Sequence, residues 1–381
     1  MEVFDKIRNG KCPQCKLGSP NVYEFRDSDE YLKKQIPRVL RERKKLGLAG
    51  LVGGLECVII NTELDLLKPT VKEFLRYTGL DFIAAFEDLN YLTCVLQRTG
   101  SADFLIRARK EKKNPFLPIN KYPKSKHLPN TRLETFVFLT KDIEKYFAIQ
   151  KSRGVSFLTK DIIRNDRYSF IQTIPSSFTG NSIGFIQWHK KSGDYVTDES
   201  KILNWKFKKP NRKYLKNIKQ LDHAATRVRA QDRDAAIIEF MELTNYNFDF
   251  AIYIKKFNSI TNVARLSKKD FGMVFTSGIS KYISDELSGP TEKFIRNYGT
   301  RVHHIAFRTN HIGETFKAIK NDGMEFLIEL VGSTKEGLKQ TFTLPSKNTL
   351  LVTEYIHRYK SFDGFFARSN TTLLTEATIK Q

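Results

Sequence analysis

Histidine and carboxylate side chains on short, strand-like stretches are the residues of this sequence that are best suited to chemistry. Two of the seven histidines, His303 and His304, are adjacent in the stretch Arg301–Thr309. Because side chains alternate along a strand, we expect His304 to share a face with Val302 and Ala306, and His303 to point the other way. A histidine alone on a strand is usually a hydrogen-bonded core residue. A site therefore needs partners elsewhere in the chain.

Two further residues could complete a site with His304. His223 lies in the stretch LDHAATRV, which also reads as a strand, and Glu354 lies in the stretch TLLVTEYIHR. Alternation places Glu354 on an apolar face, and its expected neighbours there are Leu350, Val352 and Ile356. A carboxylate on an apolar face is costly unless it is paired or binds a metal.

Two imidazoles and one carboxylate suit non-haem Fe(II), because three ligands on one face leave positions open for substrate and O2. Zinc is the chemical rival, although the sequence has no HExxH motif. Manganese or cobalt could also occupy these ligands. Upstream of Glu354, the stretch KQTFTLP places Gln340, Phe342 and Leu344 on one face. A glutamine and an aromatic side chain are therefore expected near the candidate ligands.

An internal repeat distinguishes the residues that maintain the fold from the residues that could take part in chemistry. Seven residues recur at an offset of 169 positions, and they are mostly core and cap types: Phe138, Thr140, Ile143, Phe147, Gly154, Phe157 and Leu158. In this alignment Thr135 corresponds to His304, and Glu134 corresponds to His303. The first copy thus has the scaffold without the histidines, which favours a chemical role for the histidines of the second copy.

The repeated unit is predicted as strand, helix and strand. In the first copy the helix stops at Gly154, and a further strand begins at residues 155–158. A basic helix is expected over residues 33–45 and a loop over residues 114–130. The fold class is therefore α+β, with curved mixed sheets built from repeated units.

The chain divides at a basic, proline-containing linker. We expect an N-terminal domain without metal over residues 1–205, which begins with a helical lead-in, and the linker over residues 206–220. A metal-binding catalytic domain follows over residues 221–381. A length of 381 residues is sufficient for two such domains with separate cores.

Composition restricts location and partners. No apolar run reaches the roughly 18 residues of a membrane span, and the N-terminus lacks the apolar core of a secretory signal, so cytoplasm is the expected location. The net charge of +22 is concentrated in three runs, at residues 41–45, 107–113 and 206–213. No nucleic-acid-binding motif accompanies this charge, so the sequence favours a solvated surface with weak anion attraction over a nucleic-acid partner. A homo-oligomer is compatible with the sequence.

The four cysteines do not form a disulfide framework. Cys12 and Cys15 have the spacing of half a zinc site, but Cys57 and Cys94 stand alone and supply no second pair. Ordinary reduced thiols are the interpretation we adopt, with a zinc knuckle as the alternative.

The second half, from about Leu221 to Asn370, resembles 4-hydroxyphenylpyruvate dioxygenase, a family of the vicinal oxygen chelate superfamily. The matching motifs occur in order: LDH ending at His223, VHHIA around His304, QTFTLP beginning at Gln340, TLLVTEYIHR around Glu354, and GF ending at Phe365. The resemblance implies two open barrels of βαβββ units and a C-terminal helix. It also implies a first barrel that has lost its metal.

The resemblance further implies an activity and residue roles. His223, His304 and Glu354 would be the ligands of Fe(II), while Gln340, Phe342 and Phe365 would bind the substrate. The expected reaction of tyrosine catabolism consumes O2 and an aryl 2-oxo acid, 4-hydroxyphenylpyruvate or a close relative. It couples oxidative decarboxylation to ring hydroxylation and gives a homogentisate-type product.

The chain departs from this family at the ring end of the pocket. His303 stands where the family typically has glutamine, and Ser288–Thr291 replaces a paired-glutamine segment. Two alternatives therefore stay open. One is a dioxygenase like hydroxymandelate synthase, and the other is a non-catalytic protein of the same fold that binds an anionic partner.

Overall fold

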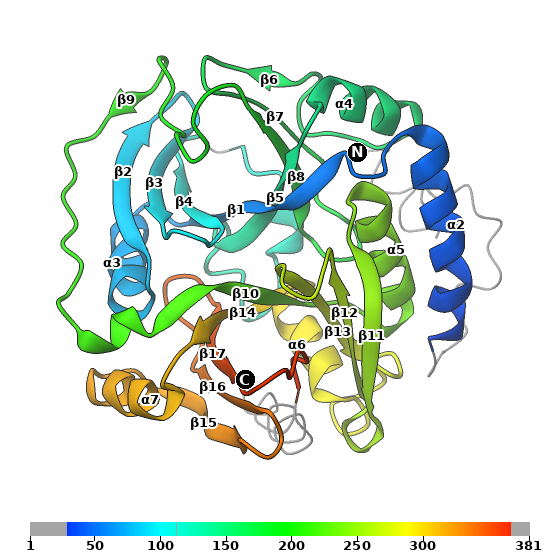
Figure 1. Ribbon diagram of the computed structural model, residues 1–381, viewed down its shortest axis with the longest axis vertical. Helices are drawn as coiled ribbons and strands as arrows, with labels where there is room; N and C mark the ends of the chain where they lie inside the picture. The colour runs from blue at the N-terminus through cyan, green and yellow to red at the C-terminus, as the bar shows by residue number, and fades with distance from the viewer. Residues whose placement is uncertain (1–28, 112, 367–381) are drawn as a thin grey trace.

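The computed structural model describes residues 29–111 and 113–366, and within them the chain forms four consecutive βαβββ units (Figure 1). The first unit comprises β1 (Val52–Thr62), α3 (Leu67–Tyr77), β2 (Asp81–Glu87), β3 (Tyr91–Gln97) and β4 (Asp103–Arg109). The second comprises β5 (Arg132–Thr140), α4 (Ile143–Ser152), β6 (Ile163–Arg164), β7 (Tyr168–Gln172) and β8 (Ser182–Trp188). The third comprises β10 (Ile218–Arg227), α5 (Arg233–Leu243), β11 (Asn247–Ile254), β12 (Ser259–Arg265) and β13 (Gly272–Gly278). The fourth comprises β14 (Arg301–Thr309), α7 (Ile312–Asn321), β15 (Phe326–Ser333), β16 (Leu338–Thr343) and β17 (Val352–Arg358).

The units pair into two curved mixed sheets, which confirms the predicted α+β class. In the described residues one sheet has the order β6-β7-β8-β5-β1-β4-β3-β2-β9, where β9 is Lys201–Ile202. The other has the order β11-β12-β13-β10-β14-β17-β16-β15. In each sheet the first strands of two units join the halves as an antiparallel pair, β1 with β5 and β10 with β14. The C-terminal helix predicted from the resemblance is absent up to residue 366, and residues 367–381 lie outside the described residues.

The elements outside the units connect the two sheets. The basic stretch near the N-terminus forms α2 (Glu30–Leu46), which packs on α5 of the second half (Figure 1). Between the sheets, an irregular segment follows β9 and passes through a short 3-10 turn, η2 (Lys213–Lys216), into β10. Because β10 begins at Ile218, the last residues of the predicted linker belong to a strand. A further helix, α6 (Pro290–Tyr298), precedes β14, and the other 3-10 turns are η1 (Leu117–Ile119), η3 (Ala230–Asp232) and η4 (Lys255–Phe257).

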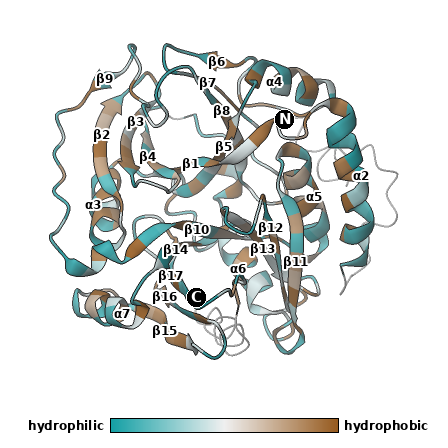
Figure 2. Cartoon of the chain, in the orientation of Figure 1, coloured by the Kyte–Doolittle hydropathy of each residue, from teal (hydrophilic) through white to brown (hydrophobic). Residues whose placement is uncertain are grey.

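The central strands of each sheet are buried on both faces, because one face lines the barrel and the other packs on helices and on the other half. Nearly every residue of β5 and β14 is buried, as expected for strands that are covered on both sides. Phe104 of the first half and Phe307 of the second stack with ring centroids 5.8 Å apart. The ring centroids of Phe136 and Phe271 are 6.0 Å apart. Hydrophobic residues are prominent on β1, β2 and β11, whereas much of α2 and of the segment before β10 is hydrophilic (Figure 2).

The repeat predicted from the sequence matches the second and fourth units. Helices α4 and α7 are followed by Gly154 and Gly323, whose positive φ angles of 84° and 92° favour glycine. The strand predicted at residues 155–158 is wrong, because Phe157 makes only an isolated bridge to Thr173. Just beyond it, local hydrogen bonds replace ladder pairing, including one of 2.8 Å from Thr159 Oγ1 to the Asp161 carbonyl oxygen.

Candidate metal centre

Two β-bulges between β10 and β14 set the geometry of the candidate site. Leu221 pairs with Phe307 and His223 with Ala306, so Asp222 is an extra residue on β10. Farther along, His304 pairs with Ala225 while Val302 pairs with Thr226, so His303 is an extra residue on β14. Bulges kink a strand and redirect its side chains. Here each bulge residue directly precedes a candidate ligand.

The bulge at His303 overturns the expected alternation of side chains. Ala306 faces the barrel interior, as predicted for the face of His304. Val302 instead packs in the large core with Ile305 and Phe307, because the extra residue shifts the two-residue period. The prediction that His304 and Val302 share a face was therefore wrong.

Strand β17 brings the carboxylate to the histidines. It runs parallel to β14 and pairs Glu354 with Ala306, which itself lies opposite His223. Glu354 Oε2 is 3.1 Å from His223 Nε2 and 3.4 Å from His304 Nε2. The three candidate ligand atoms all lie within 4.8 Å of one another, and the three side chains are buried. In the described part of the chain, this is the only such cluster of three or more metal-binding side chains.

Two details at the edges of the neighbouring strands differ from the sequence prediction. Val352 and Ile356 line the barrel interior with Glu354, as expected, but Leu350 precedes β17 and has a φ of 61°. Leu344 is exposed because β16 ends at Thr343, so it does not share the inward face of Gln340 and Phe342.

The three predicted substrate residues are all buried beside the cluster. Phe342 pairs with Glu354 across β16 and β17, and its ring centroid lies 5.4 Å from that of His304. The Phe365 ring lies 4.9 Å from His223, and Gly272 leaves space for it, since an added Cβ would be 2.8 Å from Phe365 Cζ. Gln340 lies two positions before Phe342 on the same strand. Its amide nitrogen and oxygen have no hydrogen-bond partner among the described residues.

The protonation of the cluster follows from burial and neighbouring charge. Burial, together with the charges of His303, His223 and Arg227, lowers the pKa of His304 and keeps its imidazole neutral. Burial also disfavours charge on His223, but Glu354 and Asp222 outweigh it and raise its pKa to about 9. Burial raises the pKa of Glu354, and nearby His223 opposes that shift. Glu354 Oε1 has no hydrogen-bond partner among the described residues.

Asp222 contacts His223 and Arg358 contacts Asp222, although neither residue was predicted to belong to the site. Asp222 Oδ1 lies 2.8 Å from His223 Nδ1, which fixes the proton on Nδ1 and leaves Nε2 facing Glu354. Burial alone would raise the pKa of Asp222, but His223 and Arg358 hold it well below its usual range. Arg308 also donates to Asp222, at 3.0 Å. The sequence did contain a signal for Asp222, because this carboxylate directly precedes the candidate ligand His223.

The first half carries the same scaffold with different side chains. Thr135 occupies the position of His304, as the repeat predicted, and its hydroxyl donates to Gln172 at 3.2 Å. The strand registers place Cys57 where the second half has His223, and Gly184 where it has Glu354. Cys57 is buried, as is Cys94, whereas Cys12 and Cys15 lie outside the described residues.

Comparison with known proteins identifies the architecture. No family model and no curated protein sequence matches the chain. Among solved structures, a triple mutant of 4-hydroxymandelate synthase from Streptomyces coelicolor superposes with a TM-score of 0.64 at 15% identity, over 86% of this chain and 99% of that one. The chain has the two-barrel vicinal oxygen chelate fold. This confirms the fold implied by the resemblance.

A second solved structure supports the same fold. A fusion protein of a xylose isomerase-like TIM barrel and 4-hydroxyphenylpyruvate dioxygenase superposes with a TM-score of 0.61 at 13% identity. The match covers 92% of this chain and 58% of the fusion protein.

In the described residues, no helix is long and apolar enough to cross a membrane.

Proposed function

We propose that this protein is an Fe(II)-dependent dioxygenase that acts on an aryl 2-oxo acid, 4-hydroxyphenylpyruvate or a close relative. The observation that carries the proposal is the buried cluster of His223, His304 and Glu354, with ligand atoms within 4.8 Å of one another. Two imidazoles and one carboxylate are the donor set of non-haem iron sites with open positions. The similarity to two-barrel dioxygenase structures supports this choice over a zinc site.

The residues present fit a metal ion. Glu354 is buried with a raised pKa, and its Oε1 has no partner in the part of the chain that the structure describes. This is a costly arrangement that a bound cation would relieve. His304 is held neutral, as a ligand must be. A bound cation would displace the proton that the raised pKa of His223 keeps on Nε2, while Asp222 orients the ring through Nδ1. Fe(II) held by these residues would supply the redox chemistry that couples decarboxylation of a 2-oxo acid to hydroxylation by O2.

The surrounding side chains would bind the substrate and exclude water. Phe342 and Phe365 pack edge-on against the rings of His304 and His223, so they line the site with apolar surface next to two candidate ligands. Gln340 is buried, and its amide donor and acceptor have no partner within residues 29–111 and 113–366, which suits it to orienting a polar group of the substrate.

A second candidate is a dioxygenase of the hydroxymandelate synthase type. The superposition on 4-hydroxymandelate synthase favours it, and His303 lies next to the site, with its Nδ1 2.9 Å from that of His304. Incubation of the iron-loaded protein with 4-hydroxyphenylpyruvate and O2 separates the two candidates. Homogentisate supports ring hydroxylation, whereas 4-hydroxymandelate supports the second candidate.

The decisive experiment is an oxygen-free titration of the Fe(II)-loaded protein with 4-hydroxyphenylpyruvate. We expect a visible charge-transfer band that saturates, and its loss in His304→Ala because one ligand is missing. Thr135→Ala, at the same position of the first half, should keep the band. If the iron-loaded protein binds no 2-oxo acid, the proposed substrate class is wrong. If the protein holds no stoichiometric iron and His304→Ala changes nothing, a non-catalytic binding role is supported instead.

A further inference from the structure

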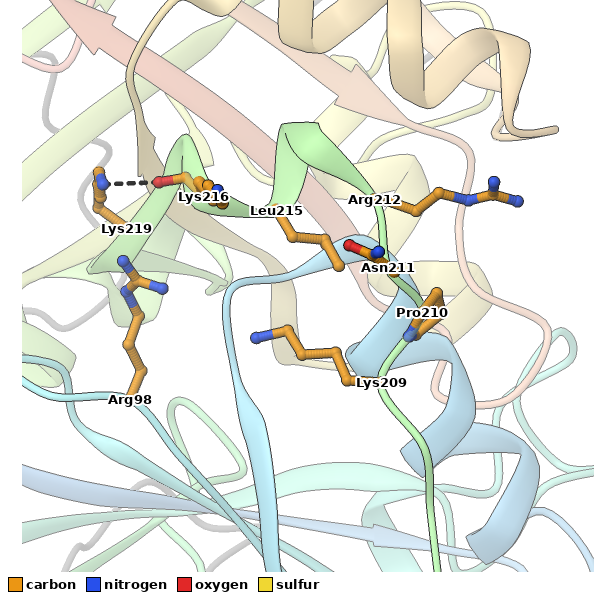
Figure 3. Close-up of a pocket in the computed structure, with 8 residues that line it drawn as sticks. All are labelled: Arg98, Lys209, Pro210, Asn211, Arg212, Leu215, Lys216 and Lys219. Atoms are coloured by element: carbon orange, nitrogen blue, oxygen red, sulfur yellow. Dashed lines mark hydrogen bonds between the residues drawn. The ribbon is translucent and has the colours of Figure 1, made fainter.

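A pocket of about 380 Å³ lies where the segment before β10 meets the first half of the molecule (Figure 3). Its wall combines the turn after β3 with the segment from Lys209 to Lys219. Five of the eight residues that line it are cationic and none is acidic. These five are Arg98, Lys209, Arg212, Lys216 and Lys219. None of them belongs to the candidate metal centre.

Tertiary contacts fix this cationic wall in place. Arg98 donates to the Gly79 carbonyl oxygen at 3.1 Å, and Lys209 donates to the same oxygen at 2.9 Å. A Cβ at Gly79 would lie 2.4 Å from the Ile218 carbonyl oxygen and 2.5 Å from Arg98 NH1. The backbone at Gly79 therefore needs a glycine, and the close approach holds the pocket wall together.

The pocket has more positive charge than its neighbours neutralise. Asp81 pairs with Lys209 at 2.9 Å, and Asp322 pairs with Arg212 at 2.8 Å. Arg212 points away from the space toward which Arg98 and Lys209 extend (Figure 3). Lys219 donates to the Lys216 carbonyl oxygen at 2.6 Å. Among the described residues, no carboxylate forms an ion pair with Arg98, Lys216 or Lys219.

The shape of the pocket indicates the size of its ligand. Its volume falls within the range of small-molecule sites, about 300 to 1,000 Å³, and is too large for a single monatomic ion. Leu215 and Asn211 also line it, so it offers apolar contact and an amide beside the cations. A guanidinium and several ammonium groups on one wall are the donors that phosphate groups prefer.

The distribution of basic residues does not favour an extended nucleic acid. Of the three basic runs in the sequence, residues 41–45 lie on α2, on the opposite side of the molecule from the segment before β10 (Figure 1). Arg109, in the run at residues 107–113, has a buried side chain that pairs with Glu134 at 2.6 Å. The first run is therefore remote from the pocket and Arg109 of the second is paired, whereas residues 209–212 of the third run line the pocket.

We propose that this pocket binds a small anion that carries two or more phosphate groups. Such a ligand would neutralise Arg98, Lys216 and Lys219 together, while Lys209 and the backbone at Gly79 keep the wall in place. The site is separate from the metal centre, so its existence does not depend on the proposed dioxygenase function.

Isothermal titration of the full chain with inorganic pyrophosphate tests the proposal, at about 0.15 M salt, where weak surface attraction is screened. We expect saturable binding to a single site. The variant Lys216→Gln/Lys219→Gln should weaken it by about tenfold or more, because two cations of the pocket wall are lost. The control Lys33→Gln/Lys34→Gln removes the same charge from the exposed face of α2 and should bind normally. Circular dichroism and thermal melting verify that both variants fold.

Each further outcome bears on the proposal. Tighter binding of ADP than of pyrophosphate supports it and assigns a nucleotide as the ligand, with the nucleoside against Leu215. Equal affinities for ADP and pyrophosphate also support the proposal and show that the phosphate groups alone determine binding. Equal losses in the pocket variant and in the α2 variant would overturn it, because net charge alone would then explain binding. Absence of saturable binding would also overturn it.

Discussion

Arg358 holds Asp222 through two hydrogen bonds, of 2.6 Å from NH1 to Oδ2 and 2.8 Å from NH2 to Oδ1. Its third nitrogen, Nε, donates to the Gly364 carbonyl oxygen at 2.8 Å, and its guanidinium lies 4.9 Å from the Phe365 ring centroid. Because Asp222 also contacts His223, one arginine connects a candidate ligand to the segment that covers it. Asp222 and Arg358 therefore act as positioning residues for the cluster.

Asp222→Asn should weaken metal binding by about 10- to 100-fold, because the amide no longer fixes the His223 tautomer or neutralises Arg358. An anaerobic titration with Fe(II) or Co(II), followed by absorbance, measures this loss. Glu56→Gln alters the corresponding bulge residue of the first half and should leave metal affinity unchanged. Equal affinity of Asp222→Asn and the unmodified protein would contradict the positioning role.

Metal should stabilise the protein only when Glu354 is present. At a metal concentration of about 100 times the dissociation constant, binding adds about 2.7 kcal/mol to the free energy of unfolding. Glu354→Gln should lose this increment because a neutral amide replaces the anionic ligand. Thermal melting with Co(II) and with EDTA checks the prediction. A Tm increase by metal that persists in the variant would show that the ion binds elsewhere.

Gln340→Leu should separate stability from substrate binding. Because its amide has no hydrogen-bond partner among the described residues, replacement by an apolar side chain should leave the free energy of unfolding unchanged or raise it by about 1 kcal/mol. Affinity for the 2-oxo acid should nevertheless fall, as seen by titration of the iron-loaded protein. Gln172→Leu is the contrasting variant, since Gln172 accepts a hydrogen bond from Thr135 and its loss should destabilise. Clear destabilisation by Gln340→Leu would refute the prediction.

Glu292 should make the fold less stable at alkaline pH. Burial raises the pKa of Glu292 to about 7, against the partial opposition of hydrogen bonds from the backbone of Gly278 and Ala230. A raised folded-state pKa means that the folded protein binds the proton more tightly than the unfolded chain. The resulting stability is complete below about pH 4.5 and is lost as the pH rises through about 7.

Between pH 5 and pH 8, the free energy of unfolding should therefore fall by on the order of 2 kcal/mol more in the unmodified protein than in Glu292→Gln. The glutamine keeps an acceptor oxygen for both backbone donors but does not titrate. Urea unfolding at the two pH values measures the difference. Parallel pH dependence in the two proteins would assign the effect to other groups.

Local sequence patterns were sufficient to predict most elements of the site. Strand β14 begins and ends as predicted, and the repeat correctly placed Thr135 opposite His304. Strand alternation also placed Glu354 on an inward face, where it lies beside His223. These predictions succeed because period-two alternation and helix-stop glycines depend on neighbours only a few residues away.

By itself, then, the sequence determined the repeated scaffold and the identities of His223, His304 and Glu354. Only the tertiary structure decided that bulges at Asp222 and His303 redirect the two histidines, because a bulge depends on pairing with a distant strand. The contact of Arg358 with Asp222 joins residues 136 positions apart. The basic pocket likewise combines Arg98 with the segment before β10. No local pattern encodes such contacts, since they arise only when the sheets close and the halves pack together.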